Sequence, residues 1–454
     1  MKRAAGWVML GAAPKERTNS ARPNVLFIMT DQQTASAMSV AGNEYLHTPN
    51  LDSLAARGIL FRQSYCTAPV CSPSRSSLVT SRMPHETGVP HNEHQQFDTG
   101  LPSMGSLFRH AGYETAWTGK WHLPTSYPKE SAIPGFDYLQ PSTRPERDFS
   151  GTIVDAYVAD SAIEFLTSAH ATPFLLGVSF HNPHDICGLP SEGYPEPDDG
   201  KPLPPLPPNF AVDPGEPEFI SRQRKREQYG PENTRTVGWS DDQWRYYLHR
   251  YYRFVEAVDV HIGRVLDALR QAHIEENTLV IFTSDHGEGV AAHQWVVKLM
   301  LYDEPTRVPL IVSWPGVIPH RVEKRHLASG LDIVPTMCDY ADIPIPSSLR
   351  GKSLRKSIES PHSEGRPFVV TELHITPEEE GRMIRTALYT YVVFSTGASP
   401  EMLFDRIADP GEMNNLAQDP ARRGVLEWHR RTLEEWMATT GDGFQAECLG
   451  SAAG

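Results

Sequence analysis

The sequence is short of cysteine, of long apolar runs and of positive charge, and each shortage excludes a class of protein. Its five cysteines among 454 residues are odd in number and widely scattered, which excludes a disulfide framework and a zinc-ligand spacing. Beyond the first residues, no stretch approaches the roughly 20 apolar residues that span a bilayer. The formal charge of -14 argues against a nucleic-acid partner, because a phosphate backbone requires Lys and Arg. An anionic small substrate stays open, since one site can be positive within an acidic protein.

The first residues carry a basic start and a short apolar run from Ala4 to Ala13. This run lies at the short end of what a secretory signal needs and contains two glycines. We expect residues 1–21 to be a leader or a disordered terminus. The pattern fits a cytoplasmic protein and an exported, periplasmic one about equally well.

Short apolar segments recur along the chain, and each breaks into polar residues at its carboxyl end, as buried parallel strands do. They cover residues 24–29, 173–181, 278–288 and 308–316. Helical patterns lie between them, at residues 49–58, 103–112 and 251–272. The alternation predicts an α/β fold, a large mostly parallel sheet sandwiched by helices.

The pattern changes near residue 367. The segments "FVVTELH" and "IRTALYTYVVFS" are typical of antiparallel strands, and residues from 423 onward form an amphipathic closing helix. We therefore expect a catalytic domain over residues 22–367 and a smaller C-terminal subdomain, an antiparallel sheet plus a helix, over residues 368–454. The proline-rich stretch 189–218 indicates a surface excursion.

Two expected strand ends carry metal-ligand chemistry. Asp31-Gln32 follows the first strand and Asp285-His286 follows a later one, at the edge where open α/β sheets bind their ligands. Either pair alone would also fit a helix cap. Together their carboxylates and amide oxygen favour one divalent cation such as calcium or magnesium.

Cys71 lies in "CTAPVCSPSRSS", where Ser72 and Pro73 look like the N-cap and first residue of a helix. A cysteine there faces free backbone N–H groups and the positive end of the helix dipole, an anion site. Taken alone, the residues predict a thiolate of low pKa that acts as a nucleophile. The plainer alternative, a small buried thiol, fits poorly beside this cap.

The segment "CSPSR", inside "APVCSPSRSSLVTSRMPHETGV", resembles the signature of the formylglycine-dependent (type I) sulfatases of the alkaline phosphatase superfamily. Further segments are similar to that family, in the family's order, from about Pro23 to Ala417. They are "TGKWHL", "FHNPHDICG", "TSDHGE", "LYDEPTRVPLIVSWPG" and "LFDRIADPGEMNNLA".

The resemblance implies that Cys71 is a precursor rather than a nucleophile. In the family, a formylglycine-generating or anaerobic sulfatase-maturating enzyme oxidises this cysteine to formylglycine, an aldehyde. One hydroxyl of the hydrated aldehyde attacks the sulfur of a sulfate ester, and loss of the second hydroxyl's proton expels sulfate. A serine would remain as a stable sulfate ester, so the aldehyde gives covalent catalysis an exit.

The resemblance also implies roles for individual positions. The metal ligands would be Asp31, Gln32, Asp285, His286 and the modified residue 71, with Ca2+ expected and Mn2+, Mg2+ or Zn2+ open. The residues that hold the anion or move protons would be Arg75, Lys120, His122, His184 and Lys298. Weaker candidates are His181, His293 and Arg307.

Two positions depart from the common family pattern. Many members have Asp at position 32 and Asn at position 286, so Gln32 removes a negative charge and His286 adds a nitrogen ligand. This combination resembles phosphonate monoester or phosphodiester hydrolases and choline-sulfatase relatives, whereas "FHNPHDICG" is closer to the N-sulfoglucosamine sulfohydrolases. A catalytically silent carbohydrate-binding protein is the non-enzymatic alternative, and the intact Cys71 argues against it.

We expect the substrate to be a sulfated saccharide or sulfated small molecule. Groups that bind sulfate cannot recognise the alcohol, so specificity must come from segments around the mouth. The candidates are His91, Asn92 and His94, the proline-rich excursion, and the aromatic run 239–252. Trp239 and Trp244 would stack on sugar rings, or they and the tyrosines simply begin a buried helix.

Overall fold

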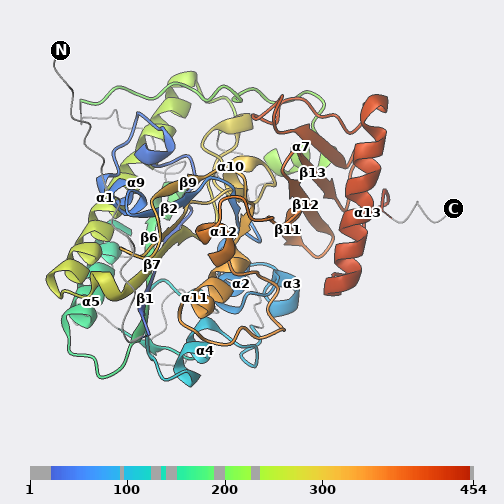
Figure 1. The fold of residues 1–454 in the computed structure, drawn as a ribbon. Coiled ribbons are helices and arrows are strands. Elements are labelled where there is room, and N and C mark those ends of the chain that lie inside the picture. Colours follow the sequence, from blue (N-terminus) through green and yellow to red (C-terminus); the bar gives the residue numbers. More distant parts are fainter. Residues whose placement is uncertain are drawn as a thin grey trace, which may run out of the picture.

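An eight-stranded sheet forms the centre of the larger part of the protein (Figure 1). The computed structural model describes residues 22–92, 97–123, 134–139, 151–188, 200–225 and 236–449. In spatial order the strands are β5 (Asp137–Tyr138), β4 (Glu114–Gly119), β6 (Phe174–Pro183), β1 (Asn24–Asp31), β7 (Thr278–Ser284), β8 (Leu310–Ser313), β2 (Gly58–Phe61) and β9 (Arg321–Glu323). The expected leader, residues 1–21, and His94 lie outside the described residues.

The prediction of a mostly parallel sheet is confirmed, with one correction. Strands β5, β4, β6, β1 and β7 run parallel to one another, and β2 runs parallel to β9. The segment 308–316, expected to repeat the parallel design, contains β8, which is antiparallel to both β7 and β2. An apolar run marks a buried strand but not its direction, so the sequence could not show this.

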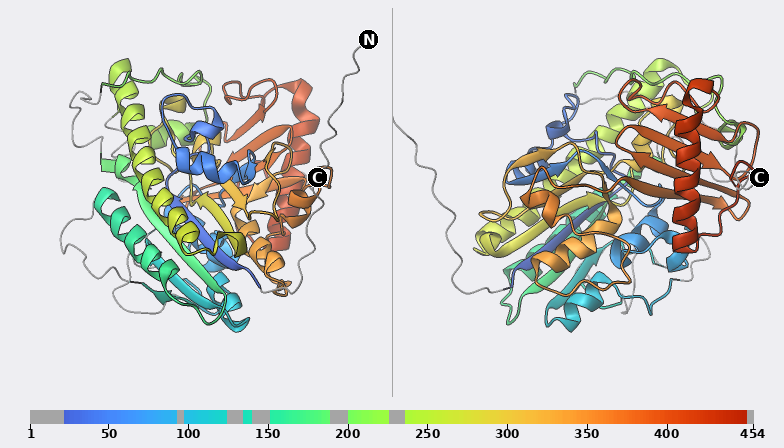
Figure 2. Two further views of the ribbon diagram at one scale, coloured as in Figure 1. Left: turned by 60° about the vertical axis from the view of Figure 1, so that its left-hand side comes forward. Right: turned by 45° about the vertical axis from the view of Figure 1, so that its right-hand side comes forward.

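Helices cover both faces of this sheet (Figure 2). One face packs against α1 (Pro49–Ala55), α5 (Gly151–Thr167) and α9 (Asp241–Gln271). The other packs against α2 (Cys71–Thr80), α4 (Met104–His110) and α11 (Ile333–Tyr340). Residues of β1 alternate between the two cores, because successive strand residues point to opposite faces.

Shorter elements complete the larger part. They are α3 (Pro84–Thr87), α7 (Glu218–Arg224), α10 (Asp303–Thr306), α12 (Arg355–Glu359), and the two-stranded sheet of β3 (Ser64–Tyr65) and β10 (Ala328–Ser329). None of the helices within the described ranges is long and apolar enough to cross a membrane.

Helix α9 begins ten residues before the expected start at 251. Its N-cap is Ser240, whose side chain accepts a hydrogen bond from the backbone N–H of Gln243. Trp244 is 3% exposed and packs in the core, with Tyr247 and Tyr251 fully buried. The prediction that Trp244 stacks on a sugar is therefore wrong, and the alternative of a buried helix holds for it.

A second sheet lies at the C-terminal end of the chain. Strands β11 (Phe368–Thr376), β12 (Glu379–Thr386), β13 (Tyr389–Phe394) and β14 (Glu401–Asp405) form an antiparallel meander. Helix α13 (Arg423–Thr440) crosses one face, as the right-hand view of Figure 2 shows. The other face packs on residues 295–302 of the larger part.

A chain of buried charges also joins the two parts. Both ring nitrogens of His374, on β11, face carboxylates: Nδ1 lies 2.8 Å from Glu380 and Nε2 lies 3.1 Å from Glu372. His85, on α3, has Nδ1 2.6 Å from Glu372 and Nε2 3.3 Å from the carbonyl oxygen of Thr440. Carboxylate and carbonyl oxygens only accept, so each ring donates from both nitrogens and is an imidazolium.

These contacts predict a loss of stability at alkaline pH. Burial opposes the charge, but the hydrogen bonds that the rings donate to Glu372 raise the pKa of His85 and of His374 above the ordinary 6.5. A raised folded-state pKa gives stability that is complete below the ordinary value and is lost as the pH rises through the folded one. The free energy of unfolding, measured by urea denaturation, should therefore fall as the pH rises above 6.5.

The double variant His85→Gln/His374→Gln should lose this part of the pH dependence. His110→Gln, a change at an exposed histidine that bonds only its own helix, is the matched control and should keep it. An identical pH profile in wild type and double variant would contradict the assignment.

Candidate active site

Four neighbouring parallel strands end beside one another and present the polar residues of the site. Asp31 is the last residue of β1. The residues that directly follow β4, β6 and β7 are Lys120, His184 and Asp285. The carboxyl ends of parallel strands meet at one edge of the sheet, where such folds bind ligands. The sheet order therefore brings together residues up to 254 positions apart, as between Asp31 and Asp285.

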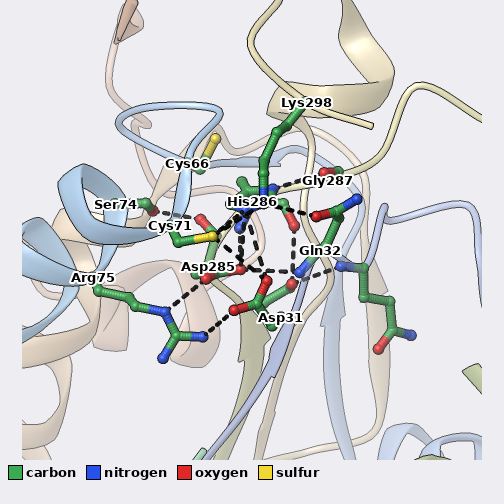
Figure 3. Close-up of polar contacts among 12 residues, drawn as sticks. Asp31, Gln32, Cys66, Cys71, Ser74, Arg75, Asp285, His286, Gly287 and Lys298 are labelled. Atoms are coloured by element: carbon green, nitrogen blue, oxygen red, sulfur yellow. Dashed lines mark hydrogen bonds and ion pairs between the residues drawn. The ribbon is translucent and has the colours of Figure 1, made fainter. Parts of the chain in front are cut away.

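Arg75 connects the two carboxylates of this edge. Its Nη2 donates to Oδ2 of Asp31 and its Nε donates to Oδ2 of Asp285, each over 2.8 Å. All three side chains are 0% exposed. Arg75 thus holds the outer oxygen of each carboxylate, which leaves both Oδ1 atoms facing the centre of the site (Figure 3). Arg75, which the resemblance puts among the residues that hold the anion or move protons, is paired with the two carboxylates in this structure.

Cys71 is the first residue of α2 and is fully buried. Its Sγ lies 3.2 Å from Nζ of Lys298 and 3.3 Å from Nε2 of His286. His122 and His184 also lie close to this thiol. The site residues predicted around position 71 therefore do surround it.

The start of α2 differs from the expectation. The N-cap is Val70, not Ser72, and Pro73 is the third residue of the helix. The backbone N–H of Ser72 donates instead to Oδ1 of Asn92, over 2.9 Å. The sequence "SP" imitates a cap locally, but the acceptor comes from a segment 20 residues away, which no local pattern shows.

Cys66 and Cys71 are both buried, but the pKa values of their thiols are shifted in opposite directions. Burial opposes ionisation of Cys71, but the ammonium groups of Lys298 and Lys120 hold its pKa well below the ordinary value. Burial raises the pKa of Cys66, and the nearby Asp285 carboxylate raises it further. Cys66 therefore has the character of a small buried thiol. Cys71, for which that role was the alternative interpretation, has the character of a thiolate instead.

The histidine His184 is neutral in this environment. Burial and then the charges of Lys120 and Lys298 lower its pKa to about 3. Lys120 itself lies 2.6 Å from Oδ2 of Asp31 and is 3% exposed. Lys120 is therefore held against a carboxylate, and Lys298 against the Gln32 amide oxygen and the Cys71 thiol.

The donor set fits a divalent cation. One ligand atom from each of Asp31, Cys71, Asp285 and His286 lies within 4.8 Å of the others. Nδ1 of His286 lies 2.8 Å from the carbonyl oxygen of Gly287, so Nδ1 carries the proton and Nε2 offers its lone pair to the centre. Two carboxylate oxygens and one imidazole nitrogen suit calcium, magnesium, manganese or zinc.

Gln32, which we expect as a further ligand, is held in place by a residue that the sequence reasoning missed. Its amide oxygen faces the site, 2.9 Å from Nζ of Lys298. Its amide nitrogen donates to Oε2 of the buried Glu288 over 2.6 Å. A single Glu after Gly287 is ordinary on a protein surface, and only the segment "TSDHGE", read as a loop at a strand end, could have suggested Glu288.

The weaker candidates have other partners. His181 pairs with Asp185 over 3.4 Å, and Arg307 donates to Asp303 over 2.6 Å. His293 stacks on the ring of Tyr302 with 3.9 Å between centroids. Each therefore has a structural role that accounts for its position.

Comparison with known proteins agrees with this geometry. The sequence model of the family described as Sulfatase matches residues 23–343, and that described as N-sulphoglucosamine sulphohydrolase, C-terminal, matches residues 291–439. A Delta 4,5-hexuronate-2-O-sulfatase of Bacteroides thetaiotaomicron is 31% identical, over 97% of this chain and 93% of the relative. An ulvan-active sulfatase of Formosa agariphila is 29% identical, over 95% and 84%.

Solved structures give the same picture. One described as a 2-O GAG sulfatase is 31% identical, has a TM-score of 0.84 and covers 93% of both chains. A phosphonate monoester hydrolase of Agrobacterium radiobacter is 22% identical with a TM-score of 0.74, over 92% and 96% of the two chains. At that identity the likeness is one of fold alone.

Removal of Arg75 should be strongly destabilising. Arg75→Ala leaves two buried carboxylates without their shared cation, so the free energy of unfolding should fall by about 3–5 kcal/mol in metal-free protein. Arg75→Lys keeps the charge but cannot reach both carboxylates at once, so it should lose less. Urea denaturation in the presence of a chelator measures both.

The control is Arg264→Ala, which removes an ion pair with Asp160 whose side chains are 39% and 56% exposed. It should cost less than about 1 kcal/mol. Similar losses of unfolding free energy for Arg75→Ala and Arg264→Ala would show that Arg75 stabilises the fold no more than an exposed ion pair does.

Proposed function

The chain belongs to the sulfatase family, and from this premise we propose that it hydrolyses the sulfate ester of a sulfated saccharide at residue 71. The observation that carries the proposal is the setting of Cys71. It opens a helix at the end of the central sheet, in contact with Lys298 and beside the cluster of metal-ligand side chains. A surface thiol or a packing residue has no reason to collect these groups.

Residue 71 would act after oxidation to formylglycine. As its hydrate, this residue supplies one hydroxyl that attacks sulfur and a second that allows sulfate to leave. Conversion also removes the thiol that Lys298 contacts at 3.2 Å. Lys298 is then available to an anionic ligand.

Lys120 and Lys298 would bind the sulfate group. Their ammonium groups both act on residue 71, and one contacts Asp31 while the other contacts Gln32. Fixed charges aimed at the oxygens of a transferring group stabilise the transition state more strongly in a buried site than in water. The low exposure of Lys120, 3%, meets that condition.

His184 would assist departure of the alcohol. As a neutral imidazole it can donate one hydrogen bond to the leaving oxygen. Burial lowers its pKa most, and the charges of Lys120 and Lys298 lower it further, to about 3. A sulfate group that pairs with the lysines would remove their part of this shift. Binding of the substrate thereby raises the proton affinity of His184 and prepares it to act as an acid. His122, the other histidine on residue 71, would accept a proton there.

The cation would be held by Asp31, Gln32, Asp285 and His286. When bound, it supplies a Lewis acid that polarises a sulfate oxygen and lowers the proton affinity of the attacking hydroxyl. The two carboxylates are kept in place by Arg75, so the ligands are arranged before any ion arrives. Calcium is the ion we favour, because oxygen donors dominate the set.

Similarity to enzymes named for sulfated sugars supports a saccharide substrate. The relatives include the hexuronate-2-O-sulfatase described above and an N-acetylglucosamine-6-O-sulfatase of Bacteroides thetaiotaomicron, 26% identical over 90% of this chain. His91 and Asn92 lie close to the start of α2, since Asn92 accepts the hydrogen bond of Ser72. From that position they would contact the sugar.

Mass spectrometry of the peptide that contains position 71 should detect formylglycine after expression with a maturating enzyme. Cys71→Ala should abolish turnover, because no hydroxyl can then form the covalent bond. Cys66→Ala, which removes the other buried thiol of the same segment, is the matched control and should retain turnover. Full activity of protein whose position 71 is entirely unmodified cysteine would refute the proposal.

Turnover should be higher for a sulfated saccharide than for an aryl sulfate or an aryl phosphonate. We expect kcat/KM to favour the best of the unsaturated hexuronate 2-O-sulfate, N-acetylglucosamine 6-O-sulfate and glucosamine N-sulfate by at least about tenfold, equal to ~1.4 kcal/mol of transition-state binding. His91→Ala should lower the saccharide value and spare the aryl sulfate. Asn92 is unsuitable for this test because it supports the start of α2. A phosphonate hydrolysed faster than every sulfate would overturn the substrate assignment.

A further inference from the structure

Glu288 is a fully buried carboxylate three residues beyond Asp285. Each of its oxygens accepts hydrogen bonds. Oε2 accepts from Nε2 of Gln32 over 2.6 Å, and Oε1 accepts from the hydroxyl of Tyr247 over 2.7 Å and from the backbone N–H of Val297 over 2.5 Å. Its partners are neutral donors, so the carboxylate is held by hydrogen bonds and not by an ion pair. It therefore binds the nitrogen end of the Gln32 amide, whose oxygen end contacts Lys298.

The contact with Glu288 determines which end of the Gln32 amide faces the site. With the nitrogen on Glu288, the oxygen faces Lys298 at 2.9 Å. The reversed amide would set its oxygen against the Glu288 carboxylate and its NH2 group against the Lys298 ammonium. Both contacts would then become repulsive, so the hydrogen-bond network allows one orientation only.

Lys298 alone could not keep this orientation. In the proposed function it turns to the sulfate group, and a cation beside Gln32 would repel it. Glu288 stays in place through either event, because Tyr247 on α9 and the backbone of Val297 hold its other oxygen. An amide presents an oxygen to a metal only while its nitrogen is occupied elsewhere.

We propose that Glu288 is the positioning residue that makes Gln32 a metal ligand, by binding its amide nitrogen and turning its amide oxygen toward the cation. This inference rests on the proposed function, since it takes the cluster of Asp31, Asp285 and His286 as the cation site. Glu288 would touch neither substrate nor metal, yet it would affect the affinity of the site for the metal.

A purely structural role would have a different signature. Glu288 also ties α9 to the loop before Lys298, so its loss could simply loosen the fold. Tyr247→Phe weakens the same tie from its other end and leaves the contact with Gln32 intact. This variant should lower the unfolding midpoint and keep the metal affinity within about twofold, since it does not reach the ligands.

The test is a double-mutant cycle read out as calcium affinity, measured by calorimetry on full-length protein freed of metal. Glu288→Gln, an isosteric change, lets the Gln32 amide turn either way and should weaken binding by about 10- to 100-fold. The same change made in the Gln32→Glu background should cost little, because both ends of a carboxylate are oxygens and need no orientation. The amide of the new glutamine can then donate to it.

Each outcome decides the question. If Glu288 acted only through its long-range charge, the loss would be equal in both backgrounds, and the proposal would be wrong. No loss in the Gln32 background would refute it too. Should Glu288→Gln fail to fold without metal, Glu288→Asp serves instead. It keeps the charge but is shorter by one methylene, so it should also weaken calcium binding, and wild-type affinity in that variant would overturn the inference. Absence of cation binding by the wild type would instead reject the proposed function itself, and the inference with it.

Discussion

The site depends on the pairing of one buried guanidinium with two buried carboxylates. Asp31 and Asp285 end neighbouring strands and would repel each other at full burial, and burial together with Asp31 raises the pKa of Asp285. Arg75 offsets this repulsion with one N–H to each. Because Arg75 lies on α2, one turn after Cys71, the same contact fixes the helix that carries residue 71 against the strands that carry the metal ligands.

The C-terminal sheet contributes to this site although it supplies none of its side chains. Its inner face packs on Trp295, Met300, Leu301 and Tyr302, which bracket Lys298. Lys298 sits between residues of left-handed backbone, Val297 and Leu299, whose conformations cost energy for non-glycine residues and persist only when surrounding structure imposes them. The backbone of Glu372 on β11 also donates to Thr67, just before Cys71. The second sheet therefore acts as a support that holds Lys298 and the approach to α2 in place.

Much of this could be predicted from sequence, and the failures have physical reasons. The strand ends that carry Asp31 and Asp285 were found because a buried parallel strand is a continuous apolar run, which makes its polar end conspicuous. The direction of β8, the cap of α2 by Asn92 and the role of Glu288 were missed, because each depends on a partner far away in the chain. The prediction that Trp244 contacts a sugar was wrong because α9 buries a broad face at its start. A broad buried face leaves no regular alternation of apolar and polar residues from which the helix could be recognised. The sequence showed which residues carry chemistry. Where one local pattern fitted two structures, only the tertiary contacts could decide between them.

The charge of the whole chain gave no information on the charge of its site. A protein of formal charge -14 places Arg75, Lys120 and Lys298 around one buried thiol. The low dielectric there strengthens each of their interactions. Arg75 is committed to the two carboxylates, and Lys120 shares one of them. Within the described residues, the ammonium group of Lys298 contacts the Gln32 amide oxygen and the Cys71 thiol, so it is the cation least neutralised by fixed carboxylates. An anionic ligand is therefore attracted toward residue 71 from the side of Lys298. Position 32 carries a neutral amide, held by Glu288, and a carboxylate there would instead pair with Lys298 as a fixed negative charge.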